Sequence, residues 1–259
     1  MLKPPFPSYF FHAHGVAFGA TFTKPFHAVV ESQSATAICS IGGHATAASS
    51  GPFNFREVVR IGRSSTQIAA VEEHPELPRD DPKKSFDTVV TCSLEDVNIF
   101  NQFKADEIVA HLAVKTDSTG RIYQFNTIGT RFVKLRVGGV PVNPTLVDEH
   151  GLQYSTGESL HPVFDMKTEK QIPQQMGVTD SHLTTLVSEV KVDSKHIKVL
   201  GNGIYVPDFG VVYLAEYLVA PHSRQLNMFR IEFGCSIDGR GSGGGVGANG
   251  ATCPPPPFP

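Results

Sequence analysis

The chain has 259 residues, of which 40% are hydrophobic, and it carries a formal net charge of −3. This length and composition suffice for one large all-β domain or two small ones, and the near-neutral charge gives no electrostatic attraction to nucleic acid or anionic lipid. No apolar run approaches the roughly 20 residues that cross a bilayer, so we expect no membrane span.

Residues 1–13 are predicted to form an extended arm, because three early prolines disfavour a helix and favour polyproline II. Phe6, Tyr9, Phe10 and Phe11 make this arm apolar, so it packs either on its own domain or on a neighbouring molecule. The segment lacks the long apolar core of a secretory signal. We therefore expect either that a leader was removed or that the protein is not exported by that route.

Residues 14–237 carry the alternating pattern of a single β domain. The alternation starts with Val16, Phe18, Ala20 and Phe22, and further strands are expected at 28–30, 35–40, 53–61 and 65–71. Residues 44–50 are small and also fit a strand. Segment 72–84 is charged and holds three prolines, which indicates a surface loop.

The clearest pattern lies at 86–114, which predicts two strands with a bend between them. In its second half Ile108, Ala110, Leu112 and Val114 alternate strictly with other residues, which places one set of side chains on one face of a strand. No enzyme motif occurs in this stretch.

The rest of the domain is also predicted to be β, apart from one excursion. Gly138 and Gly139 separate two apolar runs and indicate a hairpin. Residues 156–182 are polar and irregular, and they are expected to form a long excursion. Segment 211–220 fits a short helix or a strand, and its β-branched and aromatic content favours the strand. The strands are expected at 121–124, 131–137, 185–192, 196–200, 204–206, 211–220 and 227–233.

Residues 238–259 are predicted to be a Gly/Pro-rich C-terminal arm, with a flexible glycine half and a stiff proline half. The ending PPPPFP resembles the KPPFP stretch near the N-terminus. Paired Pro/Phe arms suit docking into grooves between subunits, because such segments lose little freedom on binding. The expected self-assembly contacts are Pro4, Pro5, Phe6, Phe10, Phe11, Pro257 and Phe258.

The four cysteines are too far apart in sequence for a CxxC metal or redox motif. They are Cys39, Cys92, Cys235 and Cys253, and they permit two disulfides or four free thiols. Among the pairings we favour Cys235 with Cys253, since such a bridge would hold the C-terminal tail to the domain.

The candidate metal and catalytic residues form no recognisable motif. His12 and His14 would share one face of a strand, yet no Asp, Glu or Cys is adjacent. The acidic pairs 72/73, 80/81, 106/107 and 148/149 lack the alternating ligands of a calcium loop or any sign of a glycosidase cleft. GxSxG and phosphate-loop motifs are absent, so we predict no catalytic residue, no metal and no cofactor.

Five stretches follow one another over about residues 14–233: HGVAFGATFT, GGHATAASS, CSLEDVNIFNQFKADEIVAHLAV, FVKLRVGGVPVNP and VPDFGVVYLAEYLV. In this order they resemble the bacterial "choice-of-anchor" surface proteins, whose ectodomains are all-β and rich in Gly, Ala and Thr. The chain departs from the family in lacking a visible signal peptide, anchor helix or sorting motif. The resemblance implies an extracellular or cell-surface role and no reaction.

The sequence therefore predicts an all-β fold, mainly antiparallel, either a β-sandwich or an irregular β-solenoid with extended arms at both ends. The expected function is a non-enzymatic structural protein that assembles with copies of itself by exchanging arms or strands. The alternatives are a monomeric adhesin or ligand-binding β module, with 72–84 or 156–182 as the contact surface, and a hydrolase whose cleft residues form no motif. We expect no nucleic-acid partner, and a surface ligand or glycan is left open.

Overall fold

The structure, a computed structural model, describes residues 9–78, 81–120, 122–146, 164–165, 170–171, 182–220, 223–234 and 237–252. Every regular element in this part of the chain is a β-strand, and every strand pair is antiparallel, as predicted. The strands form two large open sheets, called sheet A and sheet B here, and β14 (Phe164–Asp165) pairs with β15 (Lys170–Gln171) alone.

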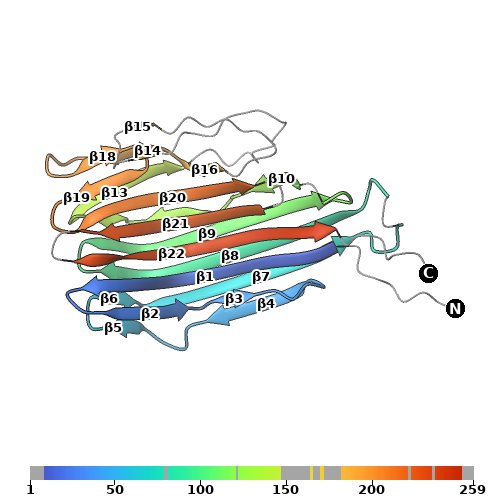
Figure 1. Cartoon of the computed structure of the whole chain (residues 1–259), viewed down its shortest axis with the longest axis horizontal. Helices are drawn as coiled ribbons and strands as arrows, with labels where there is room; N and C mark the ends of the chain where they lie inside the picture. Colours follow the sequence, from blue (N-terminus) through green and yellow to red (C-terminus); the bar gives the residue numbers. More distant parts are fainter. Residues whose placement is uncertain are drawn as a thin grey trace.

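Sheet A brings the first and last strands of the described chain side by side (Figure 1). Its order is β18-β19-β20-β21-β22-β1-β2, with β16 beside β20 and β3 beside β1. The strands are β1 (Tyr9–Lys24), β2 (Ala28–Gln33), β3 (Thr36–Ala37), β16 (His182–Thr185), β18 (Lys198–Leu200), β19 (Gly203–Val206), β20 (Gly210–Ala220), β21 (Ser223–Phe233) and β22 (Asp238–Thr252).

Sheet B is built around the long hairpin of β8 and β9. Its main order is β17-β13-β12-β9-β8-β6-β5; β10 and β11 also pair with β9, and β7 lies between β8 and β4. The strands are β4 (Gly43–Ala48), β5 (Phe53–Phe55), β6 (Val59–Ile61), β7 (Arg63–Glu73), β8 (Ser85–Ile99), β9 (Phe103–Asp117), β10 (Ile122–Asn126), β11 (Arg131–Val133), β12 (Arg136–Val137), β13 (Val140–Leu146) and β17 (Val187–Val192).

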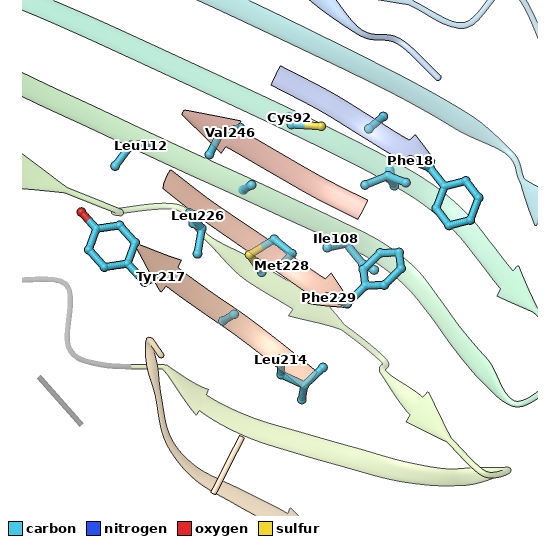
Figure 2. Packing of buried hydrophobic residues seen from close by; sticks show 14 of the residues in the cluster. Phe18, Cys92, Ile108, Leu112, Leu214, Tyr217, Leu226, Met228, Phe229 and Val246 are labelled. Atoms are coloured by element: carbon cyan, nitrogen blue, oxygen red, sulfur yellow. The ribbon is translucent and has the colours of Figure 1, made fainter. Parts of the chain in front are cut away.

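The core lies between the two sheets, which makes the fold a β-sandwich and not a solenoid. Strands β1 and β22 of sheet A lie against β8, and β21 and β22 lie against β9. Figure 2 shows Ile108 and Leu112 of sheet B facing the same interior as Leu226 and Phe229 of sheet A. All four side chains are at most 1% exposed, so their apolar area is removed from water and stabilises the stacking of the sheets.

The β8–β9 hairpin confirms the two strands predicted at 86–114. Its turn is tight: the Gln102 amide donates to the Ile99 carbonyl at 3.0 Å, and Phe100 and Asn101 both have positive φ. Asn101 is well suited to this backbone region, and its amide is also held by the Asn98 side chain at 3.0 Å. The sharp reversal lets the alternating apolar side chains of both strands point into one core.

The prediction of a flexible glycine-rich half in the C-terminal arm is wrong, because residues 238–252 form the central strand β22. β22 pairs with β1 on one side and β21 on the other, so its backbone groups are hydrogen-bonded along both edges. Its glycines leave space that neighbouring side chains fill: a Cβ on Gly243 would lie 2.5 Å from the Phe229 ring, and one on Gly250 would overlap the Tyr9 hydroxyl. The proline half of the arm lies outside the described residues.

The predicted N-terminal arm ends earlier than residue 13, because Tyr9 to Ala13 form the first part of β1. The β-sandwich thus extends past both predicted arm boundaries, to residues 9 and 252.

Two other predictions of local structure hold. The Gly138–Gly139 turn joins β12 to β13, and 211–220 is the strand β20. The single strand predicted at 53–61 is wrong, because this segment is a short hairpin in which β5 pairs with β6. Residues 74–84 connect β7 to β8, so the predicted loop begins two residues after residue 72. Most of the predicted excursion at 156–182 lies outside the described residues.

Candidate assembly surface

Two of the predicted assembly contacts, Phe10 and Phe11, lie among the described residues, and one is exposed while the other is buried. Phe10 lies on the outer face of β1 and is 39% exposed. Phe11 points into the core at 5% exposure, where its ring centroid lies 5.0 Å from that of Tyr9 and 6.0 Å from that of Phe86. Phe11 thus packs in the core of its own sandwich, and its role as an assembly contact stays a prediction. The other expected contacts, Pro4, Pro5, Phe6, Pro257 and Phe258, lie outside the described residues.

The edge strand β4 is the feature that best fits contact with another β-strand. It pairs with β7 over all six of its residues, and in the described part of the chain it is hydrogen-bonded to no other strand. Its sequence GHATAA contains no Lys, Arg, Asp, Glu or Pro. An edge with unpaired N–H and C=O groups is a template for pairing with a further strand.

The backbone of β4 presents alternate residues to this free edge. The Ser49 amide donates to the Ser64 carbonyl at 2.8 Å, which marks 49/64 as a pair bonded toward β7. Because bonded and non-bonded pairs alternate in an antiparallel ladder, the N–H and C=O groups of His44, Thr46 and Ala48 face away from β7. The side chains of these three residues are exposed on the outer face of sheet B.

Four other edge strands carry features that discourage pairing. β2 contains Glu31, β17 contains Glu189 and Lys191, and β5 and β18 are only three residues long. Charges and short length are the usual means by which proteins protect sheet edges. β4 has neither feature. Its row of hydrogen-bonding groups is longer than those of β5 and β18, and it is uncharged, unlike those of β2 and β17.

Two exposed apolar side chains flank the start of this edge. Ile41 is 75% exposed two residues before β4, and Val71 is 50% exposed on β7, next to the residue that pairs with Gly43. Burying such side chains against another molecule would add apolar contact to strand pairing. We use the name edge surface for His44, Thr46 and Ala48 together with Ile41 and Val71.

The two described cysteines are free thiols, so no disulfide forms at Cys39 or Cys92. Cys39 is exposed, and its thiol lies 3.3 Å from the Gly42 carbonyl. Cys92 is in the core, where burial raises its pKa to about 11 and keeps the thiol protonated. Cys235 and Cys253 lie outside the described residues, and their pairing stays a prediction.

The metal candidates lie in ordinary surroundings. His12 and His14 share the outer face of β1 with ring centroids 6.1 Å apart. Asp106 forms an ion pair with Lys134 at 2.6 Å, and Glu107 forms one with Arg131 at 2.8 Å. Among the described residues, no three His, Cys, Asp or Glu side chains gather as metal ligands. Nor does this part of the chain contain a helix long and apolar enough to cross a membrane.

Sequence reasoning missed the edge surface, although residues 44–50 fit a strand. The lack of charged residues and proline in GHATAA is the available signal. That β4 lies at an edge depends on its partners, which come from other parts of the chain.

Comparisons with known proteins locate the chain in a family without assigning it an activity. No curated protein and no solved structure matches it. One family matches over residues 9–153, a segment that begins at the first residue of β1 and covers more than half of the chain. The chain belongs to this family, which is described as Domain of unknown function (DUF8256).

Proposed function

We propose that this protein is a non-enzymatic structural protein that assembles with copies of itself by pairing the β4 edges of two molecules. The proposal is carried by one observation, the uncharged six-residue edge of β4 with three residues whose backbone groups face outward. The proposed location at the cell exterior rests on the resemblance to the choice-of-anchor surface proteins.

The alternation of hydrogen-bonding groups restricts how two β4 strands can pair. In an antiparallel pair related by a two-fold axis, outward-facing residues must meet one another. All three such residues are used when Thr46 lies opposite Thr46 of the second copy and His44 lies opposite its Ala48. A shift by one residue would bring outward-facing groups opposite groups that already bond to β7.

This pairing would join two copies of sheet B into one continuous sheet. Ile41 and Val71 lie beside the joint and would add apolar contact. The exposed Phe10 on sheet A, and the Pro/Phe segments at both ends of the chain, are candidates for a second contact that would extend a dimer into a filament or layer.

The first test is the assembly state of the full chain at physiological salt, measured by light scattering after size-exclusion chromatography and by electron microscopy. Thr46→Pro removes the N–H that faces the free edge and leaves the bonds between β4 and β7 in place. We expect this variant to stay monomeric at concentrations where the wild type associates. Thr46→Val keeps the N–H and is the matched control, which should associate as the wild type does.

A crosslink tests the register. The two facing residues of a hydrogen-bonded antiparallel pair have Cα atoms about 5.5 Å apart, which suits a disulfide. Thr46→Cys, in a Cys39→Ser background, should form a disulfide that joins the substituted positions of two copies, identified by peptide mapping. A wild type that is monomeric at every concentration, or a Thr46→Pro variant that still assembles, would rule out the edge as the contact.

A further inference from the structure

A row of cationic side chains crosses the outer face of sheet B. Arg60 of β6 pairs with Asn98 of β8, Asn98 pairs with Lys104 of β9, and Lys104 pairs with Arg136 of β12. These strands are neighbours in the sheet, and the row spans three strand spacings, or about 14 Å. Residues that pair in this way project their side chains from the same face.

Lys104 and Arg136 lie directly opposite each other, which is unfavourable for two like charges on adjacent strands. In the described part of the chain neither forms an ion pair, and Arg136 instead donates to the Gly139 carbonyl at 2.8 Å. Among the described residues, the sheet thus places two positive charges side by side without a compensating carboxylate.

Elsewhere on sheet B, cations are neutralised by carboxylates on a neighbouring strand. Arg63 forms an ion pair with Glu95 at 2.6 Å, and Arg131 forms one with Glu107 at 2.8 Å. Lys115 lies 2.9 Å from Asp87 in the same manner. Against this pattern, the uncompensated pair of Lys104 and Arg136 is an exception that costs stability.

The row lies in a groove of about 740 Å³, a size in the range of small-ligand sites. Val97, Ala105 and Leu135, whose side chains belong to the core between the sheets, also line the groove. Four cationic and two acidic side chains line the groove, an excess of two positive charges. The cationic residues are Arg60, Lys104, Lys134 and Arg136, and the acidic residues are Asp96 and Asp106.

We infer that this groove binds an acidic oligosaccharide through its carboxylate or sulfate groups. Lys104 and Arg136 together hold one oxyanion, and Arg60 at the other end of the row meets a second. A ligand with two anionic groups about 10 to 14 Å apart fits the spacing of the strands. No aromatic side chain of the described residues lines the groove, so this part of the chain gives it no stacking surface of the kind that single-stranded nucleic acids use.

The binding test uses the full chain, calorimetric titration and melting temperature in 50 mM salt. The probes are hexagalacturonate, a heparin-derived hexasaccharide, sodium sulfate, neutral maltohexaose and a thymidine oligonucleotide. We expect at least one acidic hexasaccharide to bind tenfold or more tightly than sulfate, to raise the melting temperature, and to bind more weakly in 200 mM salt. Maltohexaose should not bind.

Each other outcome contradicts a stated part of the inference. Equal affinity for sulfate would reduce the site to a single-oxyanion site, and equal affinity for the oligonucleotide would overturn the ligand class. Binding of none of the acidic probes would overturn the inference as a whole.

Substitutions at Lys104 distinguish a binding role from a structural one, because the inference predicts that loss of this charge lowers ligand affinity and raises the stability of the unliganded protein. Lys104→Gln should weaken binding at least tenfold and raise the melting temperature of the unliganded protein, since it removes the repulsion from Arg136. Lys104→Arg should retain binding. Lys198→Gln changes an exposed lysine of sheet A and is the control that should alter neither property.

A Lys104→Gln variant that binds as the wild type does, or that melts earlier without ligand, would overturn the role of the cation row. The groove and the edge surface use different residues, so the Thr46→Pro variant should still bind the oligosaccharide. This keeps the failure of either proposal distinguishable from the failure of the other.

Discussion

The β8–β9 hairpin and the strand β22 are both central in the sandwich, yet they reach that position by opposite means. The hairpin carries its own apolar side chains, and all of its inward-facing residues from Phe86 to Val114 are buried. Seven of the fifteen residues of β22 are glycine, and Val246 and Ala248 are its buried hydrophobic residues. The hairpin supplies apolar side chains to the core, whereas the glycines of β22 leave space that side chains from other strands fill.

Phe229 connects the two regions. Its ring lies over Gly243 of β22, and its centroid is 4.5 Å from that of Phe103 at the start of β9. It is fully buried, and Figure 2 shows it beside Ile108 of the hairpin. Glycine in a central strand can therefore serve packing, because the space of a missing Cβ is filled by an aromatic ring from the next strand.

The largest effect is expected from removing a hairpin side chain that packs on Phe229. Phe103→Ala should lower the free energy of unfolding by about 3–5 kcal/mol, since Phe103 is fully buried and its loss leaves a cavity. Denaturant unfolding measures this change. Phe10→Ala, on the outer face of β1, is the control and should cost less than about 1 kcal/mol. Similar costs for both variants would contradict the assigned core.

An intermediate effect is expected from adding a side chain to β22. Gly243→Ala should destabilise the protein by about 1–3 kcal/mol, because its Cβ would lie 2.5 Å from the Phe229 ring and 2.8 Å from the Ala17 carbonyl. Gly245→Ala, two residues along the same strand, meets nothing closer than 3.6 Å and should be neutral or stabilising by up to about 1 kcal/mol.

Combining Gly243→Ala with Phe229→Leu tests the proposed cause of this loss. The smaller side chain removes the ring that opposes the new methyl group, so the two changes should be less damaging together than the sum of their separate effects. Additive losses would show that Gly243 is required for another reason.

The smallest effect concerns pH. Burial lowers the pKa of His111 on β9 and of His14, whose ring lies over Gly247 of β22, below the ordinary value of 6.5. Below pH 6.5 the unfolded chain therefore binds more protons than the folded chain, and stability falls as the pH is lowered. The free energy of unfolding should be higher at pH 7.5 than at pH 5.0.

Two variants measure how much of this pH dependence comes from the hairpin and how much from the histidine beside β22. His111→Gln and His14→Gln should each reduce the difference in unfolding free energy between the two pH values. Gly247→Ala should push the His14 ring toward solvent and return its pKa toward 6.5, measured by NMR titration of the ring protons. An unchanged His14 pKa would show that β22 does not determine the burial of this ring.

Local sequence patterns were enough to predict the all-β class, the β8–β9 hairpin, the Gly138–Gly139 turn and the loop after β7. These features depend on alternation and turn residues within a few positions, which are local properties of the chain. The place of β22 follows only from the assembled sheet, because glycine carries no alternation and the strand is defined by β1 and β21 on either side.

The same reason explains the two proposed surfaces. Lys104 and Arg136 are far apart in the sequence and become neighbours through the pairing of β9 with β12. Likewise, GHATAA is an ordinary small-residue stretch until its pairing with β7 leaves its other side open. Strand register and sheet edges arise from contacts between distant segments, and these contacts are what the sequence pattern does not contain.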